Sequence, residues 1–116
     1  MHIISATQIK QNSTRLPDEW TQEEYLRAKE ILEASGTAII FVDTILAPLG
    51  KESSVTYNPY ELKKYPEGSV FLFYCDSGKA TKERLDEYRK KLPGYHCISL
   101  HGGRGYWRTN MMLLDD

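Results

Sequence analysis

The stretch SVFLFYCDSGKAT, residues 69 to 81, decides the fold. Its first part, Ser69 to Tyr74, is a short apolar run without polar alternation, which is typical of a strand covered on both faces in a parallel sheet. Cys75 follows at the carboxyl end of that strand, and Gly78 and Thr81 are suited to a loop and to the start of a helix. The stretch therefore predicts a strand, a tight loop and a helix in succession.

The same pattern extends to both sides of this stretch. Two further runs of β-branched and apolar residues predict strands, Thr37 to Asp43 and Tyr95 to Leu100. Before the first of them, Thr21 and Glu24 form a capping box, and apolar residues then recur at helical spacing, which predicts a helix from Gln22 to Ser35. The alternation of strands and helices indicates an α/β fold.

The remaining segments give weaker patterns. Thr44 to Tyr57 shows no clear period and is predicted to be a connection over the sheet edge. Asn58 followed by proline predicts a short helix to about Tyr65. A helix is predicted to begin at Thr81, with a stop at Pro93-Gly94, and another over Tyr106 to Leu114.

Length and composition limit the possible functions. A chain of 116 residues suits one domain, residues 1–116. Its net charge of -1 gives no field that would attract nucleic acid or an anionic membrane, so neither is expected as a partner. The amino terminus lacks the pattern of a secretory signal and the apolar runs are too short to span a bilayer, so we expect a cytoplasmic protein. Two cysteines without paired spacing predict neither a disulfide framework nor a metal site.

The loop after the central strand has the properties of an anion site. In an open α/β sheet, ligands bind beyond the carboxyl ends of the strands, where Cys75 to Ala80 is expected. A helix beginning near Thr81 would direct its positive end at the loop, and Lys79 would add a charge, so a useful thiolate fraction at Cys75 is plausible. The alternative is that Cys75 simply completes a buried strand, as free cysteines often do.

Two motifs in this order resemble the carboxyl half of rhodanese-like domains. The first is the apolar strand with the Cys-x-x-Gly-x-x-Thr loop, and the second is the Leu-x-Gly-Gly turn with a downstream tryptophan. The matching positions are Cys75, Gly78, Thr81, Leu100, Gly102, Gly103 and Trp107. The resemblance covers Ser69 to Arg108 and, more loosely, Thr37 to Asp43. It implies a three-layer α/β/α domain with a central, mostly parallel sheet.

The resemblance also implies sulfur transfer. Cys75 would attack the sulfane sulfur of thiosulfate or of a persulfide donor, which could be a small molecule or a partner protein, and pass it to a thiol or cyanide. The loop would bind the substrate, with Lys79 providing charge and Thr81 capping the helix. Its substrate-binding positions would be Asp76, Ser77, Gly78, Lys79, Ala80 and Thr81. No metal or organic cofactor is expected.

The chain departs from the family pattern in its middle segment and in the cysteine loop, which keeps other functions open. Thr44 to Leu46 stands where an arginine is usual, and the His-Ile-Pro-Gly-Ala-like segment that follows in the family is missing. In the cysteine loop, Asp76 and Ala80 stand where basic residues are frequent. A catalytically weak binding or regulatory module is therefore the alternative. A cysteine phosphatase or arsenate reductase is disfavoured, because the arginine that clamps a phosphoryl group would fall at Thr81.

Other residues with possible chemical roles are expected to be structural. Cys97 is expected to pack in the core rather than to act as a resolving thiol. Asp43 is expected to bind local backbone amides, and His101 to be exposed beside the glycine turn. Core packing is also expected for the aromatic side chains Trp20, Tyr106 and Trp107.

Overall fold

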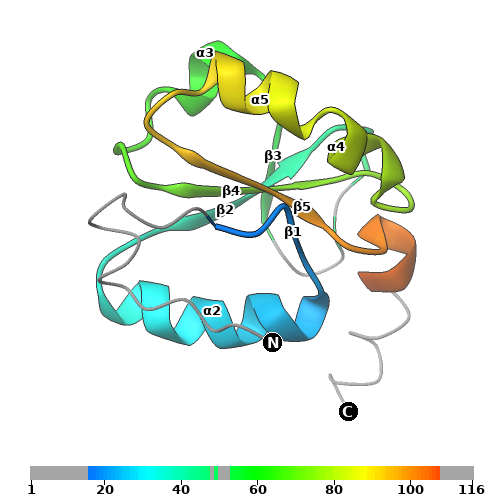
Figure 1. The fold of residues 1–116 in the computed structure, drawn as a ribbon, viewed down its shortest axis with the longest axis horizontal. Helices are drawn as coiled ribbons and strands as arrows, with labels where there is room; N and C mark the ends of the chain where they lie inside the picture. Colours follow the sequence, from blue (N-terminus) through cyan, green and yellow to red (C-terminus); the bar gives the residue numbers. More distant parts are fainter. Residues whose placement is uncertain (1–15, 48, 50–52, 108–116) are drawn as a thin grey trace.

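A five-stranded sheet in which every pair of neighbours is parallel forms the centre of the molecule (Figure 1). The computed structural model describes residues 16–47, 49 and 53–107. The strand order is β1-β5-β4-β2-β3. The strands are β1 (Glu19–Trp20), β2 (Ile39–Asp43), β3 (Ser54–Thr56), β4 (Val70–Tyr74) and β5 (His96–Leu100). The central strand β4, between β5 and β2, is the one that leads into Cys75.

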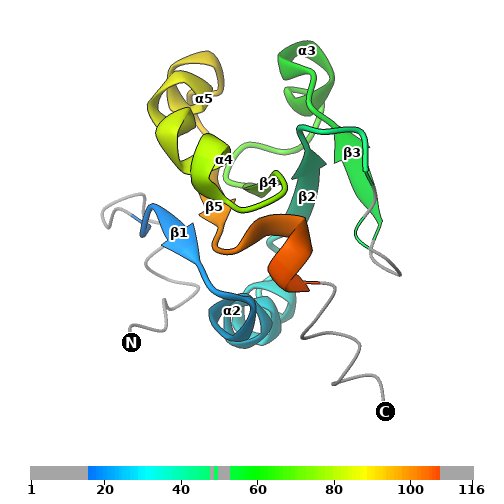
Figure 2. The ribbon, with the colours of Figure 1, turned by 90° about the vertical axis from the view of Figure 1, so that its right-hand side faces the viewer.

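Helices cover both faces of the sheet (Figures 1 and 2). They are α2 (Gln22–Ala34), α3 (Pro59–Leu62), α4 (Lys79–Glu83) and α5 (Leu85–Lys91), followed by helical residues 103–107. Helix α2 lies on one face, while α3, α4 and α5 lie on the other. The predicted three-layer α/β/α fold with a parallel sheet is confirmed. None of the helices within the described residues is long and apolar enough to cross a membrane.

Helix α2 begins as its sequence predicts. The Thr21 side chain accepts a hydrogen bond from the Glu24 N–H, and the Glu24 carboxylate accepts one from the Thr21 N–H, both at 3.1 Å. These two bonds satisfy backbone donors that the first turn of a helix leaves without partners. The helix ends at Ala34, where Ser35 is the cap, and it buries Tyr25, Ala28 and Leu32.

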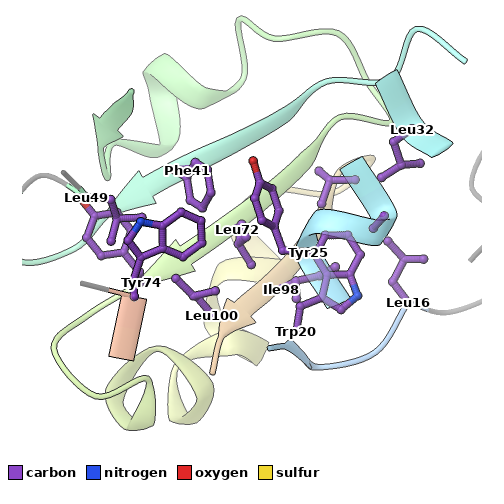
Figure 3. Packing of buried hydrophobic residues seen from close by; sticks show 13 residues of the cluster. Leu16, Trp20, Tyr25, Leu32, Phe41, Leu49, Leu72, Tyr74, Ile98 and Leu100 are labelled. Atoms are coloured by element: carbon purple, nitrogen blue, oxygen red, sulfur yellow. The ribbon is translucent and has the colours of Figure 1, made fainter. Parts of the chain in front are cut away.

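Two apolar clusters fill the spaces between the layers, and β4 contributes to both. Val70, Leu72 and Tyr74 face the α2 side, whereas Phe71 and Phe73 face the α5 side. Figure 3 shows the α2 side, where the rings of Tyr25 and Phe41 meet with centroids 4.9 Å apart. Burying a large apolar side chain contributes about 1.5–3 kcal/mol. Because the side chains of β4 alternate between two covered faces of the sheet, every residue of this strand is apolar, as predicted.

On the α5 side, Phe73 and Tyr88 stack almost parallel, with ring centroids 4.1 Å apart.

The predicted burial of Trp20 and Trp107 is confirmed, because their side chains are 1% and 3% exposed. The expectation for Tyr106 is wrong, because its side chain is 50% exposed. Tyr106 packs through its Cβ against the backbone of Gly102, since a Cβ added at Gly102 would lie only 2.4 Å from it.

Two predicted segments differ from the structure. The segment predicted as a connection contains β3, which pairs with β2 over Phe41↔Ser54 to Asp43↔Thr56. Helix α3 ends at Leu62 rather than near Tyr65, although Asn58 caps it as predicted by accepting from the Tyr60 N–H at 3.0 Å.

The last two helical predictions also need correction. The helix predicted to begin at Thr81 begins at Lys79, and it is divided at Arg84 into α4 and α5. The helix predicted over Tyr106 to Leu114 begins earlier, at Gly103, and residues 108–114 lie outside the described part of the chain.

Candidate functional site

Cys75 lies one residue beyond β4, at the carboxyl end of the central strand. Its side chain is 4% exposed. Its Sγ accepts a hydrogen bond from the Gly78 N–H at 3.1 Å and lies 3.7 Å from the Thr81 hydroxyl oxygen. The sulfur therefore lies inside the loop, in contact with a backbone N–H and a hydroxyl group. Its position beyond the carboxyl end of the central strand is the one that the sequence predicts.

The loop curls because Gly78 adopts a left-handed conformation. Its φ is 84°, and it forms the N-cap of α4. A Cβ at this position would lie 2.6 Å from the Leu100 carbonyl oxygen and 2.8 Å from the Gly102 N. Both the conformation and the crowding require glycine.

The Gly102-Gly103 turn braces the loop from the other side. The Arg104 N–H donates to the Cys75 carbonyl oxygen at 2.7 Å, and the Gly105 N–H donates to the Asp76 carbonyl oxygen at 3.0 Å. A Cβ on Gly103, which has a φ of 55°, would lie 2.2 Å from the Cys75 carbonyl oxygen. The two motifs of the sequence thus form one packed unit.

Behind the sulfur, two buried hydroxyl groups form a short network. Thr81 and Ser99 are both 0% exposed, and their side-chain oxygens lie 2.7 Å apart. Each hydroxyl also reaches the Gly78 carbonyl oxygen at 3.3 Å. The predicted role of Thr81 as a helix cap is wrong, because Gly78 occupies the N-cap and no side chain caps α4. Thr81 instead connects the sulfur to Ser99.

Ser99 is a site residue that the sequence prediction missed. It lies in β5 opposite Phe73 and bears a hydroxyl in a strand whose other described residues are mostly buried and apolar. A buried polar side chain in such a strand requires a partner. A serine in an otherwise apolar strand could therefore have indicated a site residue, but its partner could not be identified without the tertiary structure.

The environment of Cys75 favours its thiolate. Burial is the largest single influence and opposes ionisation, but it is outweighed by hydrogen bonds from the Thr81 N–H and hydroxyl and from the Gly78 and Ser77 N–H groups. Together they lower the pKa of Cys75 below its ordinary value. For Cys97, by contrast, burial raises the pKa to about 12. Cys97 is 2% exposed and packs in the α5-side cluster, as predicted.

The predicted substrate-binding residues divide into two groups. Gly78 and Thr81 are buried and contact the sulfur. The remaining positions are exposed, and they contribute mainly backbone to the loop: Asp76, Ser77, Lys79 and Ala80. The Lys79 N–H donates to the Ser77 hydroxyl oxygen at 3.4 Å, a local turn contact.

Two other predictions hold. Asp43 accepts a hydrogen bond from the Ile45 N–H at 2.8 Å, which is the expected contact with a local amide. His101 has an exposed side chain, and its Nδ1 lies 3.3 Å from a carboxylate oxygen of Glu19. Within residues 16–47, 49 and 53–107, no group of three or more His, Cys, Asp or Glu side chains could hold a metal ion.

Among the described residues, hollows open on the α5 side of the sheet, and two of them are relevant to the site. The larger, about 510 Å³, runs between β3 and α3 and includes Val55, Tyr57, Leu62 and Tyr65 among its lining residues. The smaller, about 250 Å³, lies beyond the carboxyl ends of β2 and β3, against α5. Its lining residues are Asp43, Thr44, Leu46, Thr56, Tyr57, Arg84, Glu87 and Tyr88.

The fold and the site together define a class, an α/β protein with a buried cysteine in an amide-lined loop at the carboxyl end of its central strand. No protein-family model matches the chain, and no curated protein matches it. One similar solved structure is that of the BH2092 protein from Bacillus halodurans. It is 19% identical, with a TM-score of 0.54, and the match covers 90% of this chain and 78% of that one. At this identity the similarity concerns the fold alone.

Proposed function

We propose that the protein is a rhodanese-like sulfurtransferase that carries sulfane sulfur as a persulfide on Cys75. One observation carries this proposal: the Cys75 sulfur accepts the Gly78 N–H at 3.1 Å and lies 3.7 Å from the Thr81 hydroxyl, in a loop that lowers its pKa. A thiolate is the nucleophilic form of cysteine. The proposal includes a cytoplasmic setting, in which thiols stay reduced.

The proposed reaction conserves atoms and electrons in two steps. In the first, the Cys75 thiolate attacks the outer sulfur of a donor persulfide, R–S–SH. A new bond forms between the two sulfurs, the donor S–S bond breaks, and R–S⁻ leaves, so Cys75 becomes Cys–S–SH. With thiosulfate the leaving group is sulfite. In the second step, an acceptor thiolate or cyanide attacks the outer sulfur and regenerates the Cys75 thiolate.

The curled loop suits both states of the sulfur. A persulfide is also an anion at neutral pH, and it can accept hydrogen bonds from the same N–H groups that contact the thiol. Charge-assisted bonds of this kind are roughly twice as strong as neutral ones. Because the loop backbone is closely packed around Gly78 and Gly103, the donors need little reorganisation when negative charge moves outward by one sulfur atom.

One observation favours a second candidate, a catalytically weak binding or regulatory module. Cys75 is only 4% exposed, which limits the approach of a donor. The two candidates differ in whether Cys75 gains sulfur, so one experiment separates them.

The test is intact-mass spectrometry of the reduced protein after incubation with thiosulfate or with a low-molecular-weight persulfide. We expect a gain of one sulfur atom in the native protein and in Cys97→Ala, but none in Cys75→Ala. Cys97→Ala is the matched control, because it removes the other buried thiol. If Cys75 stays unmodified with both donors while iodoacetamide still alkylates it, sulfur transfer is refuted and the binding module becomes the leading candidate.

A further inference from the structure

We propose that the smaller hollow is the donor pocket of this site and that it binds a zwitterionic α-amino-acid persulfide, such as cysteine persulfide, in preference to thiosulfate. The inference rests on the proposed function of Cys75 and adds the chemical class of the donor. It comes from the position of the pocket, its charges and its size.

One wall of the pocket is hydrogen-bonded to the end of the strand that leads into the cysteine loop. Thr44, on its wall, donates to the Tyr74 carbonyl oxygen from both its N–H, at 3.3 Å, and its hydroxyl, at 2.7 Å. Tyr74 is the residue immediately before Cys75. The pocket also occupies the side of the sheet to which Phe73 points, and the carboxyl ends of parallel strands are where α/β proteins bind ligands.

Tyr88 links the pocket to the sulfur. It lines the pocket and stacks on Phe73, two residues before Cys75. Burial raises the pKa of Tyr88, Arg84 acts in the opposite direction, and negative charge on Cys75 raises it further. The phenol ring, the guanidinium group and the sulfur therefore share one electrostatic environment.

The charges around the pocket match a zwitterion better than a dianion. The lining contains one guanidinium group, from Arg84, and two carboxylates, from Asp43 and Glu87. Asp43 is 5% exposed and accepts the Ile45 N–H, so its charge is already engaged. Arg84 and Glu87 are exposed, one turn apart at the start of α5. A single ligand carboxylate suits Arg84 and a ligand ammonium group suits Glu87, whereas two negative charges would meet two carboxylates.

Neither charged group is strongly committed elsewhere. Among the ion pairs between described residues, none joins Arg84 to a carboxylate, and its side chain interacts instead with the neutral Tyr88 hydroxyl. Glu87 lies 3.5 Å from the Lys91 ammonium group, but both side chains are at least half exposed, and exposed pairs of this kind contribute little. Both groups are thus available to a ligand.

The pocket also fits a small molecule with a short apolar part. Its volume of about 250 Å³ has room for an amino acid but not for a folded partner. The Tyr57 hydroxyl, on the lining, is buried and has no hydrogen-bond partner within the described part of the chain. Leu46 is 77% exposed at the rim and has a φ of 56°, a costly conformation for leucine that often marks a functional site.

The experiment compares donors that differ by one charge. Cysteine persulfide carries both ligand charges, cysteamine persulfide lacks the carboxylate, and N-acetylcysteine persulfide lacks the ammonium group. We expect cysteine persulfide to load Cys75 about tenfold more efficiently than either single-charge analogue, and more efficiently still than thiosulfate. Arg84→Gln should abolish the advantage over cysteamine persulfide, and Glu87→Gln the advantage over N-acetylcysteine persulfide. Lys90→Gln, a charge change on the exposed part of α5, is the control and should preserve both.

A binding measurement separates this inference from the proposed function. S-Methylcysteine has both charges but no sulfur to transfer, and NMR titration should place it at pocket residues, with affinity about tenfold weaker in Arg84→Gln. Such binding without any loading of Cys75 would uphold the pocket and refute sulfur transfer. Equal loading from all four donors, or binding of S-methylcysteine that Arg84→Gln leaves unchanged, would overturn the donor pocket.

Discussion

The Thr81 hydroxyl provides a direct test of how the loop activates Cys75. Replacing Thr81 by valine keeps the branched shape of the side chain but removes the hydroxyl group 3.7 Å from the sulfur. The side chain is fully buried, so water cannot replace the lost hydrogen bond. The Ser99 hydroxyl loses its contact with Thr81 at 2.7 Å but keeps the Gly78 carbonyl oxygen as a partner at 3.3 Å, which limits the loss of stability. The variant therefore perturbs mainly the stability of the thiolate.

The magnitude follows from the length of this contact. Hydrogen bonds to charged groups contribute about 1.5–3 kcal/mol, and a contact to sulfur of this length belongs at the lower end. At a pH below the pKa of the thiol, a loss of about 1.4 kcal/mol lowers the fraction of Cys75 that is ionised roughly tenfold. A more basic thiolate is also more nucleophilic, with a Brønsted coefficient of about 0.4–0.5, which offsets nearly half of the effect on a logarithmic scale. At a pH below the pKa of the wild-type thiol, the alkylation rate should thus fall about threefold to fourfold.

The assay is the rate of iodoacetamide alkylation of Cys75, followed by intact mass over a pH range of about 5 to 9. In Thr81→Val the midpoint of the rate profile should move to higher pH, because loss of the donor raises the pKa of the thiol. Thr81→Ser restores a hydroxyl and should return the profile toward that of the wild type. If folded Thr81→Val shows the wild-type profile, the hydroxyl does not stabilise the thiolate and this reasoning is refuted.

Three further predictions concern the support of the loop and the second thiol. Gly103→Ala would bring a Cβ within 2.2 Å of the Cys75 carbonyl oxygen and should lower the free energy of unfolding by about 2–3 kcal/mol in urea titrations. Gly36→Ala, also left-handed but with nothing within 4 Å, should cost only about 1 kcal/mol; equal losses would contradict the bracing role. Ser99→Ala removes the partner of Thr81 and should cost about 1 kcal/mol while slowing alkylation, and an unchanged pH profile would limit Ser99 to packing. Burial raises the pKa of Cys97 to about 12 in the folded protein, whereas this thiol ionises from about pH 8.5 in the unfolded chain. Ionisation therefore favours the unfolded chain, and the free energy of unfolding should fall as the pH rises above about 8.5. The urea midpoint of the wild type should therefore fall more steeply between about pH 8 and 10 than that of Cys97→Ala, and parallel curves would contradict the raised pKa.

The parts of the fold that could be predicted are those with a strong local pattern. The central strand β4 is apolar throughout because both of its faces are covered, and this property is visible in the sequence alone. Helix α2 could be predicted equally well, because its capping box and the spacing of its apolar residues are local features of the sequence. The short strand β3 could not be predicted, since Ser54–Thr56 has no period of its own and is held by pairing with β2.

The candidate site divides in the same way. The position of Cys75 follows from the end of β4, but the start of α4 does not follow from Thr81, because the turn depends on Gly78 packing against the Leu100 carbonyl oxygen. Ser99 lies 18 residues from Thr81, and their contact exists only when β5 and α4 are side by side. Relations of this kind are tertiary, so no local motif could have revealed them.

The two cysteines show why burial alone does not determine reactivity. Cys75 and Cys97 are exposed to a similarly small extent, 4% and 2%, yet their pKa values shift in opposite directions. Cys97 lies within β5, where the backbone N–H groups are used by the sheet, so desolvation acts almost unopposed. Cys75 lies just beyond β4, where the curled backbone directs N–H groups at the sulfur. That loop conformation requires close packing against the turn that contains Gly103. The Gly102-Gly103 turn therefore influences the pKa of the Cys75 thiol through the loop backbone, without a contact to the sulfur.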